Sequence, residues 1–251
     1  MKVALFIPCY VDQFYPQVGI ASLQLLRRLG VHVHYPTDQT CCGQPLANSG
    51  LENDARPIYE HFVRTFGEFD HIVAPSGSCT YHVQHHYDIL DQSDTVRAVR
   101  ARTIDLTDFL VDVLKLQTLP ARFPHRVGLH RSCHGLRGLR QARASELMIP
   151  EFSKLEYLLS LVRDLELVPL ERRDECCGFG GTFAVNEPAV SVRMGEDRLA
   201  DHRRAGAEFV TAGDMSCLMH LEGLARRRES SLRFVHLAEI LNSSDAVAES
   251  T

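Results

Sequence analysis

The sequence lacks several features that would assign it to common classes of protein. No stretch approaches the roughly 18 uninterrupted apolar residues that a membrane-spanning helix needs. No Lys/Arg-rich run offsets a net charge of −5, so the sequence does not favour binding to nucleic acid or to an anionic membrane. It contains no C-x-x-C pair, which structural zinc sites commonly use, and no G-x-G-x-x-G or Walker loop for a nucleotide.

The composition is that of a globular protein with many cysteines. The 251 residues, 45% hydrophobic and 24% charged, suffice for one large domain or two small ones and exclude a disordered or collagen-like chain. The apolar run before Cys9 is too short for a secretory signal, so we expect a cytoplasmic protein. Thiols stay reduced in that compartment, so the eight cysteines predict metal binding or catalysis in preference to disulfides.

The cysteines form one pattern that occurs twice: a single cysteine, an adjacent pair and another single cysteine. The first set is Cys9, Cys41, Cys42 and Cys79, and the second is Cys133, Cys176, Cys177 and Cys217. Each pair precedes a glycine, and each last cysteine follows a serine and precedes a histidine, His82 or His220, by three residues. This agreement in order predicts an internal duplication, with domains at residues 1–118 and 125–251.

Short apolar, β-branched runs predict strands, each of which leads into a cysteine-bearing loop. These runs span residues 3–7, 31–35 and 71–74 in the first half, and 127–129, 165–170 and 209–212 in the second. Helical periodicity, as at residues 19–29 and 58–66, separates them. The alternation predicts an α/β fold of two similar, mostly parallel, doubly wound sheets, which we expect a pseudo-twofold axis to relate. Ligands bind beyond the carboxyl ends of such strands, so the four thiols of each half should converge there.

Four converging thiols have several uses. Neighbouring cysteines form a strained disulfide ring, and eight buried structural thiols would not explain a repeated constellation. Zinc binding remains an alternative, because four cysteine thiolates can bind a zinc ion. An iron–sulfur cluster suits the pattern better, because the two sulfurs of an adjacent pair can bind different irons. Gly43 and Gly178 fit the same interpretation, since glycine lets the backbone approach an inorganic cofactor.

With these motifs the sequence resembles the cysteine-rich CCG domain, which occurs in tandem in heterodisulfide reductase, in the iron–sulfur subunit of glycolate oxidase and in lactate utilization protein A. The resemblance covers essentially the entire chain. Two versions of the last motif, Pro-Ser-Gly-Ser-Cys ending at Cys79 and Gly-Asp-Met-Ser-Cys ending at Cys217, make the chain most similar to the lactate utilization protein A family. The absence of a ferredoxin-like segment agrees with that assignment.

The resemblance implies an iron–sulfur electron-transfer subunit of a cytoplasmic complex that oxidises L-lactate or another 2-hydroxy acid and supports growth on lactate. Such a subunit is not expected to be active alone. Its implied partners are a ferredoxin-domain iron–sulfur subunit and a third small subunit. The eight cysteines would bind iron–sulfur clusters, expected to be 4Fe-4S, with one or two in each chain.

One departure from the relatives affects the expected chemistry. The heterodisulfide reductase relatives end their motif in C-x-x-C, and their five cysteines hold a non-cubane cluster; here His82 and His220 replace the fifth cysteine. This argues against that cluster, although either imidazole could replace or supplement a thiolate. A heterodisulfide or thiol–disulfide reductase-type subunit and a zinc-stapled interaction module remain the alternatives.

Oxidation of a 2-hydroxy acid also needs a base and a cation for the carboxylate. Several histidines and arginines lie near the cysteines in sequence, and none of them is assigned a catalytic role. These candidates are His82, His85, His86, His130, His134, His220, Arg131 and Arg137.

Overall fold

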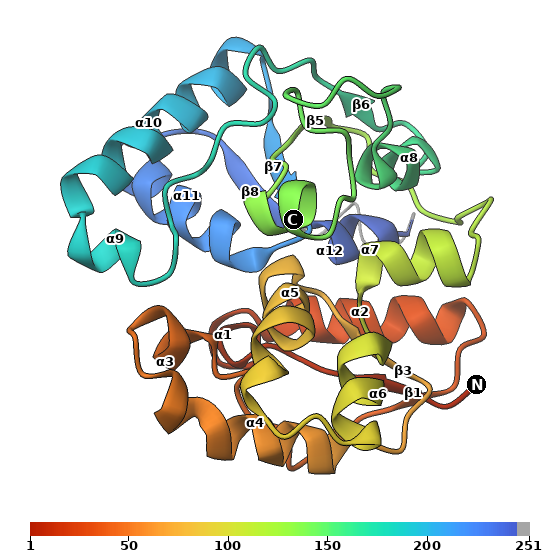
Figure 1. The fold of residues 1–251 in the computed structure, drawn as a ribbon. Coiled ribbons are helices and arrows are strands. Elements are labelled where there is room, and N and C mark those ends of the chain that lie inside the picture. The colour runs from red at the N-terminus through yellow and green to blue at the C-terminus, as the bar shows by residue number, and fades with distance from the viewer. Residues whose placement is uncertain (245–251) are drawn as a thin grey trace. The chain divides into compact units, whose positions relative to one another are not determined.

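The chain folds into two compact units, unit 1 (Met1–Phe109) and unit 2 (Leu110–Thr251). The computed structural model describes residues 1–244 (Figure 1). Each unit is built on one four-stranded sheet whose strands all pair in parallel, which confirms the predicted α/β class and parallel sheets. The predicted domain limits at residues 118 and 125 stay a prediction.

Unit 1 places its strands in the order β2-β1-β3-β4. Its strands are β1 (Val3–Leu5), β2 (Val33–His34), β3 (His71–Ala74) and β4 (Thr103–Asp105). Its helices are α1 (Cys9–Phe14), α2 (Pro16–Arg28), α3 (Gln44–Asn48), α4 (Glu52–Phe66), α5 (Gly77–His86), α6 (Asp94–Arg102) and α7 (Leu106–Asp108), with a 3₁₀ turn η1 (Tyr87–Ile89). A π-helical turn, η2 (Phe109–Val113), follows α7.

Unit 2 repeats this arrangement in the order β6-β5-β7-β8. Its strands are β5 (Arg126–Leu129), β6 (Glu166–Leu167), β7 (Phe209–Ala212) and β8 (Arg233–His236). Its helices are α8 (Lys154–Ser160), α9 (Phe183–Asn186), α10 (Pro188–Arg204), α11 (Met215–Arg227) and α12 (Leu237–Asn242), with a π-helical turn η3 (His134–Gly138).

The strand order fixes where a ligand would bind. In unit 1 the chain leaves β1 toward β2 on one side and returns to β3 on the other, so right-handed crossovers place α2 on one face and α4 and α6 on the opposite face (Figure 1). The direction reverses between β1 and β3, and the equivalent reversal in unit 2 lies between β5 and β7. The carboxyl ends of these central strands are the ligand-binding position of doubly wound sheets.

The core of unit 1 is aromatic. Phe6, directly after β1, meets Phe62 of α4 edge-on at 4.9 Å between ring centroids and Phe66 at 5.7 Å. Tyr59 of the same helix stacks on Tyr87 at 4.2 Å. Edge-to-face and offset rings of this kind add to the free energy gained by burial. The cluster also contains Cys42 and Cys79, so the aromatic core extends to the thiols.

Several elements differ in length from the sequence-based expectation. β1 ends at Leu5 and not at residue 7, because the Ile7 N–H donates to the Gln39 side chain at 2.8 Å and leaves the ladder. The edge strands β2 and β6 are shorter than expected and keep only two residues each. The helix expected over residues 58–66 begins at Glu52. β4 and β8 were not predicted, because their polar residues hide the strand pattern.

Candidate metal centres

The structure brings the four cysteines of each unit together at the carboxyl ends of the central strands. In unit 1, Cys9 begins α1 after β1, and Cys79 lies in the first turn of α5 after β3. The adjacent pair lies in the loop between β2 and α3. The Cys9 and Cys41 sulfurs are 3.6 Å apart, and those of Cys42 and Cys79 are 3.5 Å apart.

Each group consists of a buried half and a more open half. In unit 1, Cys42 and Cys79 are buried, whereas Cys9 and Cys41 are half-buried. Unit 2 repeats this division, with Cys177 and Cys217 buried, Cys176 half-buried and Cys133 exposed. A metal centre bound by these cysteines would therefore contact the core through the two buried sulfurs and lie nearer to solvent at the other two.

The thiols form a connected network of hydrogen bonds that lowers the pKa of one cysteine in unit 1 and of two cysteines in unit 2. Hydrogen bonds from Cys42 and Cys9, helped by the Gly43 N–H at 3.3 Å, lower the pKa of Cys41. Hydrogen bonds from Cys133 and Cys177, with the Gly178 N–H at 3.4 Å, likewise lower the pKa of Cys176. A cysteine binds a metal as the thiolate, so the lowered pKa values favour metal binding at Cys41 and Cys176.

The glycine after each pair is required by the backbone. Gly43 and Gly178 adopt φ of +87° and +89°, a left-handed conformation that disfavours side chains. A Cβ at Gly43 would lie 2.4 Å from the ring of Tyr59, and one at Gly178 would lie 2.5 Å from the carbonyl oxygen of Ser191. The turn that points the Gly43 and Gly178 N–H groups at sulfur thus closes only with glycine.

The last cysteine of each group begins a capped helix. The Ser76 hydroxyl accepts from the Cys79 N–H at 3.3 Å at the start of α5, and the Asp214 carboxylate accepts from the Ser216 N–H at 3.2 Å at the start of α11. These caps fix the first turn and therefore the direction of the cysteine. The positive end of the helix also favours the thiolate.

His82 and His220 hold the helix of the last cysteine to a neighbouring helix. The ring of His82 is buried, and its Nε2 lies 3.0 Å from the Tyr59 hydroxyl of α4. The Nε2 of His220 lies 3.4 Å from the Ser191 hydroxyl of α10. Tyr59 and Ser191 belong to the helices that cover the two CCG glycines. Ligation by either histidine stays a prediction.

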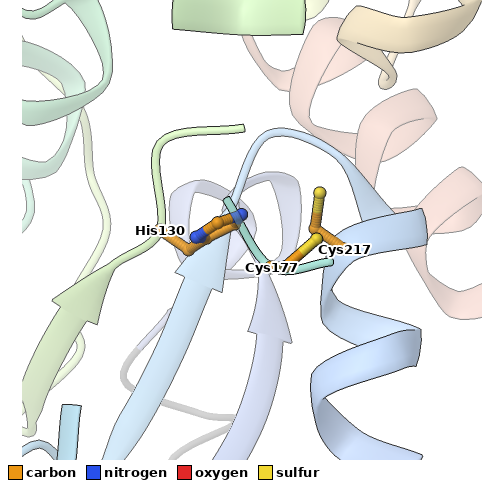
Figure 2. Close-up of side chains that lie close together, drawn as sticks. All are labelled: His130, Cys177 and Cys217. Atoms are coloured by element: carbon orange, nitrogen blue, oxygen red, sulfur yellow. The ribbon is translucent and has the colours of Figure 1, made fainter. Parts of the chain in front are cut away.

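Among the described residues, a histidine ring nitrogen lies close to two cysteine sulfurs in unit 2. His130 follows β5, and one of its ring nitrogens lies within 4.8 Å of the Cys177 and Cys217 sulfurs (Figure 2). The pKa of Cys217 is lowered, chiefly by the hydrogen bond with Cys177 and also by His130. His130 was one of six histidines near the cysteines in sequence, and only its position at the end of a central strand distinguished it.

The two arginines considered as candidates for binding a substrate carboxylate form ion pairs within the chain. The buried guanidinium of Arg131 lies 2.5 Å from Glu156 and 3.6 Å from both Glu151 and Asp174. Arg137 pairs with Glu146 at 2.7 Å. A substrate carboxylate at Arg131 would compete with three carboxylates of the protein.

The sequence did not predict the contacts made by the residues that lie two positions before the first cysteine and before the cysteine pair of each unit. Gln39 accepts from the Ile7 N–H and donates to the Leu5 carbonyl at 3.3 Å, which fastens the loop of the cysteine pair to the end of β1. At the same two positions of unit 2, Asp174 and Arg131 form the ion pair described above. Alignment of the halves at their cysteines was the signal that could have identified both pairs.

The comparisons with known proteins agree with this arrangement. The cysteine-rich domain family CCG matches residues 3–84 and 127–222, one copy in each unit. Lactate utilization protein A from Geobacillus sp. (strain WCH70) is 38% identical over 250 residues, which cover 97% of this chain and all of the relative. The chain belongs to the lactate utilization protein A family.

Other members of the lactate utilization protein A family show the same extent of similarity. The protein of that name from Bacillus subtilis (strain 168) is 36% identical over 249 residues, covering 97% of this chain and all of the relative. Among solved structures, a putative Asp/Glu racemase from Yersinia pestis matches 96% of each chain with 12% identity and a TM-score of 0.39, a likeness that says nothing about function. None of the helices within residues 1–244 combines the length and apolar character that a membrane crossing requires.

Proposed function

We propose that this chain serves lactate utilization as the iron–sulfur electron-transfer subunit of an L-lactate-oxidising complex. The observation that carries the proposal is the convergence of four thiols from three loops at the carboxyl ends of the central strands, once in each unit. Membership of a family named for lactate utilization supplies the metabolic role.

The cysteine sulfurs and the nearby backbone N–H groups are the kinds of ligand and hydrogen-bond donor that an iron–sulfur cluster needs. Each unit offers four sulfurs, and backbone N–H groups of Gly43, Gly178 and Phe179 already point at cysteine sulfur, at 3.3, 3.4 and 3.5 Å. Hydrogen bonds to sulfur raise the reduction potential of a bound cluster. A cluster held by the eight cysteines would accept and release single electrons, which suits a reaction that releases two electrons and two protons for each lactate oxidised to pyruvate.

Residues of this chain would bind these centres and would also shield them from water. Cys42 and Cys177 are 2% exposed, and the stacked rings of Tyr59 and Tyr87 close the protein side of the unit 1 group. The Tyr87 hydroxyl donates to the Cys42 carbonyl at 3.0 Å, which fixes the adjacent pair against the core. The base and the lactate-binding cation are assigned to no residue of this chain, so we propose that a ferredoxin-domain partner and a third small subunit complete the site.

Zinc binding is a second candidate, and the sulfur separations favour it. Four zinc–sulfur bonds of about 2.3 Å in a tetrahedron place the sulfurs about 3.8 Å apart. The observed separations of 3.6 and 3.5 Å lie close to that value. The chain would then be a stapled interaction module in which the cysteines carry no electrons.

The experiment that tests the proposal follows the visible absorption of the anaerobic complex, assembled with its partners, after addition of L-lactate. We expect bleaching that depends on this chain and that is absent when the Cys42→Ser and Cys177→Ser substitutions are combined in it. Glycolate, added in place of lactate, separates the two substrates. Lactate oxidation at an undiminished rate with the doubly substituted chain would contradict the proposal.

A further inference from the structure

We propose that His130 is a metal ligand, so that unit 2 holds a mixed thiolate–imidazole centre whereas unit 1 holds a thiolate centre. This inference rests on the proposed function, in that it assumes a metal centre at the cysteines. In a centre with four ligand positions the imidazole would take the place of one of the four thiolates of unit 2, and the equivalent residue of unit 1 is Phe6.

The position of His130 directs its ring at the thiols. Its backbone N–H donates to the Thr211 carbonyl of β7 at 2.8 Å, which extends the pairing of the two central strands by one residue. The side chain is 1% exposed. Figure 2 shows the ring beside the Cys177 and Cys217 side chains, and the three ligand atoms lie within 4.8 Å of one another. The imidazole therefore occupies the buried half of the unit 2 group.

Neither ring nitrogen of His130 has a hydrogen-bond partner of ordinary geometry within the described part of the chain. The ring instead faces the Cys217 thiol, which is itself one of the proposed ligands. Burying a polar group without a partner destabilises the folded state, and native proteins leave few such groups. A metal ion or an iron of a cluster between the imidazole and the two sulfurs would remove this cost, because an imidazole nitrogen is a good ligand for zinc and iron.

Unit 1 shows that the fold itself does not require an imidazole at this place. Phe6 lies three residues before Cys9, as His130 lies three residues before Cys133. Phe6 is fully buried against Phe62 and Phe66 in an apolar cluster. The same backbone position thus fills the core in one unit and offers a nitrogen donor in the other, so the histidine serves a need that is specific to unit 2.

A second buried histidine serves as the internal comparison. His202 of α10 is also fully buried, and neither of its ring nitrogens has a hydrogen-bond partner among the described residues. It lies over Gly128, where a Cβ would meet its Nδ1 at 2.2 Å. The group of close ligand atoms contains His130 and not His202. His202 is therefore the control for a buried histidine that is near the site without facing the thiols.

An imidazole ligand would change the chemistry of the unit 2 centre in a definite direction. It is neutral where a thiolate is negative, and histidine in place of cysteine raises the reduction potential of iron–sulfur centres. The centre of unit 2 should therefore be reduced before that of unit 1 in a titration, and His130→Cys should lower its midpoint potential.

The test uses the full-length chain, purified anaerobically from cells supplied with ¹⁵N-histidine or with unlabelled histidine. Pulsed electron paramagnetic resonance of the reduced protein should show coupling to a histidine nitrogen that changes with the isotope. This coupling should be lost in His130→Cys with iron and sulfide retained, and it should remain in His202→Gln. The comparison of isotopes in the unsubstituted chain needs no variant, and absence of coupling there would overturn the proposal even if a variant failed to fold.

Each other outcome overturns a defined part of the account. Full iron and sulfide without nitrogen coupling would overturn His130 ligation and leave the proposed function intact; ordered water would then satisfy the imidazole. Coupling that survives His130→Cys and disappears in a His134→Gln, His202→Gln or His220→Gln variant would assign the ligand to another histidine; Nδ1 of His134 lies 3.8 Å from the Cys133 sulfur. A chain without iron and sulfide would overturn the proposed function and, with it, the cluster ligand.

Discussion

The two units share a topology and a set of thiols but differ in what surrounds those thiols. At equivalent positions, unit 1 has Phe6 where unit 2 has His130, and the Ile7–Gln39 contact of unit 1 becomes the Arg131–Asp174 ion pair. The shared features are those that bring four sulfurs together. The differences concern the charge and polarity of the immediate surroundings, which set the potential of a bound centre.

The polar character of unit 2 extends through its core. The guanidinium of Arg198 is fully buried and pairs with the Asp201 carboxylate, which also accepts from the Arg172 N–H at 3.0 Å. The core of unit 1 instead contains the stacked rings of Tyr59 and Tyr87. Duplication thus preserved the thiol scaffold, and the two cores diverged around it. Substitutions of equivalent residues in the two units should therefore have unequal effects.

The largest effect is expected from the buried cysteine of each pair. Cys42→Ser should remove the centre of unit 1 and Cys177→Ser that of unit 2, because each thiol contacts both of its neighbours in the group. Iron and sulfide for each chain should fall by about half in either variant if both units are occupied. Elemental analysis and a sulfide assay check this, and an equal content in the variants and the unsubstituted chain would show that these thiols are not ligands.

The next largest effect is expected from the glycine after each pair. Gly178→Ala should lower the free energy of unfolding by about 3 kcal/mol, because left-handed backbone costs about 1–2 kcal/mol and overpacking adds about as much. Its Cβ meets backbone at Ser191, whereas at Gly43 it meets the Tyr59 ring, so Gly43→Ala should cost less. Urea unfolding of both variants measures the difference. Gly223→Ala, where a Cβ meets nothing within 4 Å, is the control.

A pH-dependent effect, which approaches that of Gly178→Ala only at the lowest pH, should distinguish the residues that follow the fourth strand of each sheet. His236 caps α12 through Nδ1, which accepts from the Ala238 N–H, where unit 1 uses Asp105 to cap α7. Burial lowers the pKa of His236 to about 4, from an ordinary value of 6.5. Between these values the unfolded chain binds a proton that the folded chain excludes, so stability is complete above 6.5 and is lost as the pH falls toward 4.

The loss from His236 should reach about 3 kcal/mol at the lower end of this window. His236→Asn keeps a capping oxygen without a titrating ring, so its free energy of unfolding should fall less between about pH 7 and about pH 5. Urea unfolding of both proteins at each pH measures the difference. Identical pH dependence in the two would contradict the assignment.

The smallest effects are expected from the hydroxyls that contact His82 and His220. Tyr59→Phe removes one hydrogen bond and should cost about 1 kcal/mol. Ser191→Ala removes the contact with His220 and also the 2.7 Å hydrogen bond to the Gly178 carbonyl, so it should cost more. Thermal unfolding of the two variants would reveal the order, and a larger loss in Tyr59→Phe would reverse the comparison.

The sequence predicted the parts of the molecule that repetition and periodicity encode. The duplicated cysteine spacing, the parallel α/β fold and the convergence of thiols at strand ends follow from local patterns. The partners of His82, Arg131 and His236 did not follow, because they are brought together by tertiary packing that local patterns do not encode. The difference between Phe6 and His130 is visible when the two halves of the sequence are aligned. Only the structure shows that the His130 ring is buried without an ordinary hydrogen-bond partner, which is what suggests a ligand role.

Whether the eight cysteines bind iron–sulfur clusters is decided by the content of iron, acid-labile sulfide and zinc in the anaerobically purified chain, together with its electron paramagnetic resonance spectrum. We predict about four iron and about four sulfide for each occupied unit, with a signal in the reduced protein. Zinc without sulfide, and no signal, would contradict this prediction and would make the eight cysteines structural.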